Sequence, residues 1–178
     1  MTVVVRRACE TDAMVIAGLH VETWQQAYRG QVPQHYLDSL DPEASQKNWT
    51  TLLASPDILT LVAETMGELS EIVGFCSLVR SRDADAASAT GEISAIYVRS
   101  SHWRRRAGHS LIRKTESIAR EKGYYELTVW VLETNKQARG FYEKIGFSQD
   151  GAQKLEAALG AQLVMIRYRK TKLARVSD

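Results

Sequence analysis

The segment that most limits what this chain can fold into is Glu126–Leu132, with the sequence ELTVWVL. It is almost continuously apolar, which is typical of a strand buried on both faces near the centre of a sheet. A helix pattern precedes it at Ala107–Lys122 and another follows it at Asn135–Ile145. A buried strand between two helices predicts a layered α/β fold.

Further strand patterns occur along the chain, at Val3–Arg7, Leu59–Glu64, Ile72–Val79, Glu92–Val98 and Leu163–Lys170. The polar turn Met66–Glu71 joins two of them and predicts a hairpin. The Asp-, Ala- and Ser-rich stretch Arg82–Gly91 predicts a flexible loop. A Gly-punctuated stretch before the last strand leaves room for one more, so the chain ends in one or two strands.

Three more helix patterns lie near the N-terminus. The first follows a cap at Thr11 or Asp12 and ends at Tyr28-Arg29-Gly30. Its apolar positions are Val15, Ile16, Leu19 and Ala27. A short turn or helix follows Pro33, and a further helix spans about Glu43–Leu53.

Length and composition indicate one globular domain. The chain has 178 residues, of which 44% are hydrophobic, and a formal net charge of +2. We assign residues 1–170 to the domain and 171–178 to a polar tail. The start, MTVVVRRACE, reverses the order of a signal peptide, and no apolar run approaches the roughly 20 residues of a membrane span. We therefore expect a cytoplasmic protein that binds neither membrane nor nucleic acid.

Cysteine and histidine usage gives no sign of a metal. Cys9 and Cys76 are far apart and have no metal-ligand spacing. Reduced, structural thiols are the simplest interpretation for a cytosolic chain.

Positive charge is concentrated in SSHWRRRAGHSLI, Ser100–Ile112, between a strand and a helix. A strand, a Gly-containing turn and a helix N-terminus can aim backbone N–H groups at phosphate oxygens. Gly108 would let an anion approach, and Arg104–Arg106 would add charge-assisted contacts. A basic surface cap is the alternative. A nucleic-acid backbone fits less well, because the helix that follows carries Glu116 and Glu121.

A second informative stretch is TNKQARGFYEKIGF, Thr134–Phe147. Its apolar positions, Ala138, Phe141, Tyr142 and Ile145, share one helix face. Asn135 stands at the helix start, where its amide can cap the helix or reach a ligand. Tyr142 is unusual on an apolar face because its hydroxyl needs a partner or a cavity. A buried tyrosine with a local hydrogen bond is the alternative.

Together the two stretches resemble the GCN5-related N-acetyltransferase family. The family pattern Asn-x-x-Ala-x-x-Phe-Tyr-x-x-x-Gly-Phe is met in full, by Asn135, Ala138, Phe141, Tyr142, Gly146 and Phe147. The pyrophosphate motif Arg/Gln-x-x-Gly-x-Gly/Ala is met only at Gly108. Trp103 stands at its Arg/Gln position and Arg106 at its first glycine.

The resemblance implies a mixed, mostly antiparallel sheet, with helices on both faces and the fourth and fifth strands splayed apart. It implies acetyl-CoA as the donor, with its pantetheine arm along Ile96, Tyr97 and Val98. The residues it implies around the cofactor are Arg104, Arg105, Arg106, Ala107, Gly108, His109, Ser110 and Asn135. Family members are often dimers, so a homodimer is possible.

The stretch His20–Gly30 looks like the acceptor-side helix of many bacterial members of the family. Trp24 and Tyr28 are therefore candidates for the acceptor pocket, and core aromatics are the alternative. The acceptor itself is expected to be a primary amine of a small molecule or peptide.

The chemistry suggests two catalytic residues. Tyr142, with an ordinary pKa near ~10, could protonate a leaving thiolate whose conjugate acid has a pKa near ~8.5. Glu92 could take the proton of the attacking amine through water, although a solvated charge at a strand end is an equal alternative. N–H groups near Ile96 or Tyr97 could stabilise the oxyanion. The competing function is a non-catalytic acyl-CoA-binding or regulatory module with the same fold.

Overall fold

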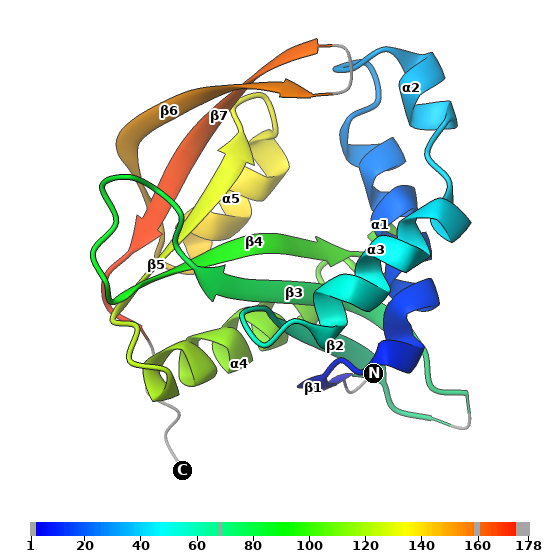
Figure 1. Ribbon diagram of the computed structural model, residues 1–178, viewed down its shortest axis with the longest axis horizontal. Coiled ribbons are helices and arrows are strands. Elements are labelled where there is room, and N and C mark those ends of the chain that lie inside the picture. The colour runs from blue at the N-terminus through cyan, green and yellow to red at the C-terminus, as the bar shows by residue number, and fades with distance from the viewer. Residues whose placement is uncertain (1–2, 68, 159–160, 174–178) are drawn as a thin grey trace.

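The computed structural model of the protein describes residues 3–67, 69–158 and 161–173. These residues contain a seven-stranded sheet in the order β1-β2-β3-β4-β5-β7-β6 (Figure 1). The strands are β1 Val3–Arg7, β2 Leu59–Thr65, β3 Ile72–Arg80, β4 Thr90–Val98, β5 Glu126–Leu132, β6 Ser148–Ala158 and β7 Ala161–Lys170. Only β4 and β5 pair in parallel; the other neighbouring strands are antiparallel. The predicted mixed α/β sheet is confirmed.

Helices cover both faces of the sheet (Figure 1). They are α1 Ala13–Ala27, α2 Gln34–Asp38, α3 Pro42–Ala54, α4 Ala107–Glu121 and α5 Lys136–Lys144, with short 3-10 turns at Glu10–Asp12 and Ser100–His102. On one face, Ile16 of α1 and Trp49 of α3 pack with Phe75 of β3. On the other face, α4 and α5 share a core with Ile93 and Val129 of the central strands. Each helix therefore buries its apolar stripe against the sheet.

The elements around β5 agree with the sequence patterns. Strand β5 has the predicted limits and is buried along most of its length. Gly123 follows α4 with φ +82° and Gly146 follows α5 with φ +88°. These left-handed conformations end a helix, and glycine adopts them without the steric cost that a side chain brings.

The start of α1 differs from the prediction. Asp12 precedes the helix, but its carboxylate makes no side-chain cap and accepts hydrogen bonds from the Arg6 guanidinium and the Cys9 N–H. Val15, which the helical spacing had put on the buried face, is 41% exposed. A nearby cation competes successfully for the carboxylate, and the apolar face of α1 is narrower than the pattern indicated.

Strand β6 was only allowed for, not located, by the sequence. It is an 11-residue strand at the sheet edge, and its side chains are mostly exposed, so it lacks the apolar alternation that marks a strand. The β6–β7 hairpin extends toward α2 (Figure 1). There Leu163 of β7 joins a small apolar cluster with Val32 and Leu37.

The loop between β3 and β4, which the sequence predicts to be flexible, makes ion pairs in its first half. Asp83 and Asp85 are ion-paired to Arg167 of β7. The sequence could not reveal this anchor, because the partner lies more than eighty positions away. At the C-terminal end, Leu173 is buried against the core, within the stretch expected to be a polar tail. Residues 174–178 of that tail lie outside the described residues.

No helix among the described residues is both long enough and apolar enough to cross a membrane.

Candidate active site

A crevice opens where β4 and β5 part. The two strands pair from Thr90 with Glu126 to Ile93 with Val129, and the parallel ladder stops there. Beyond Ile93, β4 keeps its antiparallel partner β3. The crevice is lined by Ala27, Tyr28, Ile93, Ser94, Ala95, Ile96, Tyr97, Val129, Trp130, Val131, Leu132, Asn135, Ala138, Tyr142 and Met165. The expected splay between the fourth and fifth strands is thus present, at the carboxyl ends of parallel strands where α/β proteins bind ligands.

The loop that leads from β4 into α4 has an unusual backbone. Arg104 has φ +59° and Arg106 has φ +68°, and they are the two non-glycine residues with positive φ in the described chain. Left-handed backbone is costly for residues with a Cβ. Arg106 therefore adopts the conformation that a glycine favours, at the position where the family motif has its first glycine.

The N-terminus of α4 presents free backbone N–H groups. The amide of Ser110 bonds to the Arg106 carbonyl at 2.9 Å, which closes the first turn. The N–H groups of Ala107, Gly108 and His109 come before it and have no backbone acceptor within the described residues. The side chains of Arg104 and Arg106 are exposed and form no ion pair with any of the described residues. Amides and positive charge meet here, as an anion site requires.

Packing gives a second reason for a glycine at position 108, besides the approach of an anion that the sequence suggested. A Cβ at this position would lie 3.2 Å from the ring of Phe141 and 3.9 Å from a methyl group of Val98. The missing side chain thus lets α4 and α5 approach one another beside the end of β4. Nearby, Trp103 is 43% exposed, and its indole donates a hydrogen bond of 2.7 Å to the Val98 carbonyl. Trp103 therefore ties the arginine-rich loop to β4 rather than packing in the core.

Tyr142 lines the crevice and is 5% exposed. Its ring lies against Phe141, Phe147 and Tyr168. Its hydroxyl has no hydrogen bond within the described part of the chain. Burial raises the pKa of Tyr142 well above its ordinary value, so the phenol keeps its proton at neutral pH.

Asn135 caps α5 and also lines the crevice. Its side-chain Oδ1 accepts a hydrogen bond of 3.0 Å from the Ala138 N–H. The same amide thus fixes the helix start and stands near the crevice wall, so the two roles considered from the sequence are compatible.

Glu92 lies apart from the crevice. It is on the part of β4 that still pairs with β5, opposite Thr128, and it is 6% exposed. Its carboxylate accepts hydrogen bonds from the Arg82 guanidinium at 3.2 Å and from the Arg82 N–H at 3.3 Å. The carboxylate is therefore buried and paired, not solvated at a strand end. Of the two predicted catalytic residues, only Tyr142 lines the crevice.

An aromatic cluster closes the other side of the crevice. Tyr28 lines it directly. Trp24 stands behind, with its ring 5.0 Å from that of Tyr28 and its indole donating a hydrogen bond of 2.7 Å to the Tyr97 hydroxyl. The ring of His20 packs on Trp24 and Tyr97, and burial lowers its pKa to about 4. Tyr97 was predicted only for its backbone, yet its side chain belongs to this cluster.

Sequence reasoning did not single out Trp130, which lies within the apolar run of β5. Trp130 is half-buried, lines the crevice, and donates a hydrogen bond of 3.0 Å from its indole to Asp83. A signal was available, because an indole N–H in an apolar strand needs an acceptor. Ala27 was missed although it lies in the stretch compared with the acceptor-side helix, and Met165 was missed because nothing in its own segment points to the crevice.

The described residues contain no group of three or more histidine, cysteine, aspartate or glutamate side chains arranged to hold a metal ion.

Comparison with known proteins agrees with this geometry. The acetyltransferase (GNAT) family profile matches residues 21–147, which include the arginine-rich loop, α5 and every lining residue of the crevice except Met165. The uncharacterized N-acetyltransferase YuaI of Bacillus subtilis is 30% identical over 133 residues, 75% of this chain and 73% of YuaI. The spermidine N(1)-acetyltransferase of Thermoplasma acidophilum is 22% identical and covers 93% of this chain and 96% of its own. The chain belongs to the acetyltransferase (GNAT) family and is an N-acetyltransferase.

Solved structures show the same fold. The PaiA N-acetyltransferase of Thermoplasma acidophilum, in complex with coenzyme A, superposes with a TM-score of 0.69 at 23% identity, over 96% of this chain and 99% of that one. YncA of Salmonella typhimurium, with its cofactor acetyl-CoA, superposes with a TM-score of 0.70 at 18% identity, over 100% of this chain and 98% of that one.

Proposed function

We propose that this N-acetyltransferase transfers the acetyl group of acetyl-CoA to a primary amine by direct attack, with both substrates bound at once. The observation that carries the proposal is the crevice between β4 and β5. Tyr142 and Asn135 line it together with Tyr28, so residues expected near the donor and near the acceptor face one opening. A shared opening is what a direct transfer needs, because holding both reactants in place supplies much of the rate.

The donor end rests on the start of α4. The N–H groups of Ala107, Gly108 and His109 would donate hydrogen bonds to diphosphate oxygens, and the arginines before them would add charge. The edge of β4 at Ile96–Val98 would pair with the pantetheine amides. Two fold relatives hold coenzyme A or acetyl-CoA, which supports this donor.

The reaction forms a C–N bond and breaks the C–S bond of the thioester. In the proposed chemistry, Tyr142 gives its proton to the departing sulfur. Its raised pKa keeps the proton available and makes full transfer before bond cleavage unfavourable. The phenol therefore acts as a hydrogen-bond donor that releases its proton as charge builds on sulfur.

The amine must lose a proton, and Glu92 is our candidate base. Its carboxylate stands on β4, next to the start of the crevice at Ile93. Because it does not line the crevice, a water chain would carry the proton to it. Arg82 would hold the carboxylate in place through two hydrogen bonds.

The acceptor is proposed to be a primary amine of a small molecule or peptide, with Tyr28 and Trp24 on its side of the crevice. A relative that acts on spermidine supports an amine acceptor without identifying it. The decisive experiment is a screen of amines with acetyl-CoA that follows release of free thiol. Thiol release with at least one amine, together with acetylated product by mass spectrometry, is expected; acetyl-CoA binding without turnover on any amine would refute the proposal.

We also propose that the enzyme works in the cytoplasm, since Cys9 and Cys76 are free thiols of the kind kept in a reducing compartment. A homodimer is proposed from the family resemblance. Light scattering coupled to gel filtration tests the dimer directly.

A further inference from the structure

We infer that Arg167 is a positioning residue for the acceptor side of the crevice, and that it acts through Asp83 on the indole of Trp130. The inference rests on the proposed function, because it assigns Trp130 to acceptor recognition. It concerns a buried charge that the proposed chemistry leaves unused.

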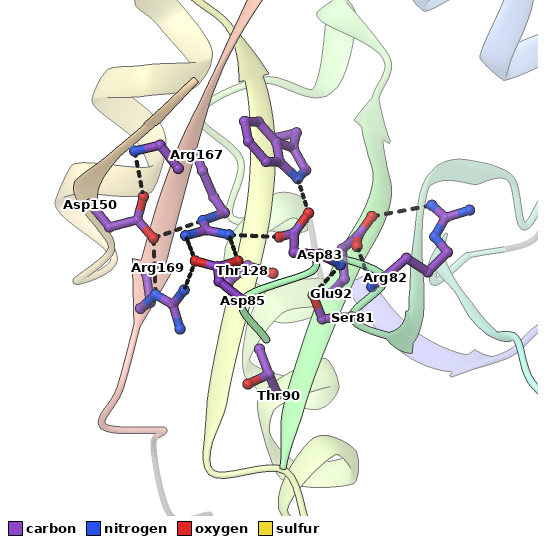
Figure 2. Close-up of polar contacts among 12 residues, drawn as sticks. Ser81, Arg82, Asp83, Asp85, Thr90, Glu92, Thr128, Asp150, Arg167 and Arg169 are labelled. Atoms are coloured by element: carbon purple, nitrogen blue, oxygen red, sulfur yellow. Dashed lines mark hydrogen bonds and ion pairs between the residues drawn. The ribbon is translucent and has the colours of Figure 1, made fainter. Parts of the chain in front are cut away.

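Arg167 is unusual because it is a cation in the interior. Its side chain is 5% exposed, and it reaches three carboxylates. Its Nε lies 2.7 Å from Asp150, its Nη1 3.0 Å from Asp83, and its Nη2 2.6 Å from Asp85. Figure 2 shows the guanidinium between Asp150 on one side and the two loop aspartates on the other. A buried arginine is tolerated when its donors find acceptors, and each of the three nitrogens of Arg167 donates to a carboxylate.

The network joins elements that are otherwise separate. Asp83 and Asp85 belong to the loop between β3 and β4, whereas Asp150 belongs to β6. Arg169, two positions along β7, adds ion pairs to Asp150 and Glu126. Together these contacts anchor the loop on the β5–β7 part of the sheet (Figure 2).

The anchored loop contacts the crevice lining through the hydrogen bond between Asp83 and Trp130. Asp83 uses Oδ2 for Arg167 and Oδ1 for the Trp130 indole, at 3.0 Å each. Since Asp83 bonds to both groups, the guanidinium fixes the carboxylate and the carboxylate fixes the plane of the indole. Trp130 in turn lines the crevice. The buried cation therefore reaches this wall of the site through a bridge of two hydrogen bonds, and its guanidinium carbon also lies 5.6 Å from the centroid of the Trp130 ring.

The ring of Trp130 already holds a cation of this chain, that of Lys154. Its Nζ lies 4.4 Å from the centroid of the Trp130 ring. This distance is typical of a cation–π contact. A ring that holds one ammonium through its face could bind the ammonium of an acceptor amine in the same way, provided that the ring keeps its orientation.

The main test is a double-mutant cycle with the best amine from the screen. Asp83→Ala and Trp130→Phe each break the same hydrogen bond, and each is expected to raise the acceptor KM roughly fivefold. The double variant is expected to show about the same rise, not the roughly 25-fold product of independent effects. The KM for acetyl-CoA stays within twofold throughout. Multiplicative effects, or an equal rise in the acetyl-CoA KM, would overturn the inference.

Asp85→Asn is the matched control, because Asp85 pairs with the same guanidinium from the same loop and makes no contact with Trp130 among the described residues. Its side chain is 62% exposed, so its loss should be mild. We expect an acceptor KM within twofold of the original. A rise equal to that of Asp83→Ala would mean that the loop as a whole, and not the bond to Trp130, matters.

A second readout does not depend on turnover. With ¹⁵N-labelled tryptophan, the indole signal of Trp130 is identified by its loss in Trp130→Phe. We expect Asp83→Ala and Arg167→Lys to shift this signal upfield and Asp85→Asn to leave it in place. An unmoved indole signal in Arg167→Lys contradicts the positioning role, even if no amine is acetylated. A shifted signal without turnover on any amine refutes the proposed function but not the positioning role. If Arg167→Lys does not fold, Asp83→Asn, which keeps Oδ1 for the indole but loses the ion pair with Arg167, gives the same reading.

Discussion

The indole Nε1 of Trp24 donates a hydrogen bond of 2.7 Å to the hydroxyl of Tyr97. The two residues are 73 positions apart and join the last turns of α1 to the splayed end of β4. The contact fixes one wall of the crevice relative to the strand that would hold the donor. Burial raises the pKa of Tyr97, so its phenol stays neutral and can still donate a hydrogen bond to a further group.

Replacing Tyr97 with phenylalanine should therefore leave the Trp24 N–H without its acceptor. We expect the free energy of unfolding to fall by about 1 kcal/mol in urea titrations. Trp24→Phe should cost about as much, and the double variant little more than either one. Additive losses would show that the two side chains act independently.

Arg106→Gly should stabilise the protein, because the residue has φ +68°. Relief of the left-handed strain outweighs the entropy that glycine adds to the unfolded chain, for a net gain of about 0.5–1 kcal/mol. Arg106→Ala removes the same charge but keeps the strain, so it is the control. Both variants should bind coenzyme A more weakly in calorimetry. Equal stabilities of the glycine and alanine variants would contradict the strain.

Tyr142→Phe should lower kcat at least tenfold and leave the KM for acetyl-CoA nearly unchanged. The free energy of unfolding should not fall, because the hydroxyl has no partner within the described residues. Tyr168→Phe is the control: its buried hydroxyl donates to Glu143 at 2.7 Å, so that variant should lose stability and keep its turnover. Undiminished turnover in Tyr142→Phe would remove this tyrosine from the mechanism.

Glu92→Gln tests the base by its effect on the pH dependence of kcat/KM. If Glu92 takes the proton of the amine, the variant should lose the acidic limb that its ionisation causes. Rates at high pH should recover in part, since the amine there is already deprotonated. Persistence of the original acidic limb would mean that another group, or water alone, accepts the proton.

The ion pair of Asp12 with Arg6 should make stability depend on acidity. Hydrogen bonds from Arg6 lower the pKa of Asp12 from 3.8 to about 2. A carboxylate whose pKa is lower in the folded than in the unfolded state stabilises the fold at pH values above its unfolded pKa. This stabilisation is lost as the pH falls from about 4 to about 2. We expect about 1–2 kcal/mol from this pair, after allowing for the partly exposed arginine. Asp12→Asn should flatten that part of an acid-unfolding curve, whereas Asp57→Asn, at an exposed position, should not.

Part of the crevice was readable in advance. The apolar run of β5 and the helix periodicity of α5 depend on neighbours within a few residues, so their limits followed from the sequence. The family pattern singled out Asn135 and Tyr142, and both line the crevice. The positive φ of Arg106 could not be foreseen, since backbone torsion at an arginine follows from the chain on either side of it.

The sequence by itself therefore determined the layered fold, the central strand and one wall of the site, because those features come from local periodicity and short motifs. Only the tertiary structure decided the place of Trp130 in the site. Trp130 reaches the crevice with an orientation set by Asp83, and Asp83 is held by a cation 84 positions away. Contacts of that kind depend on which segments the fold brings together, and no local pattern in either segment encodes the partner.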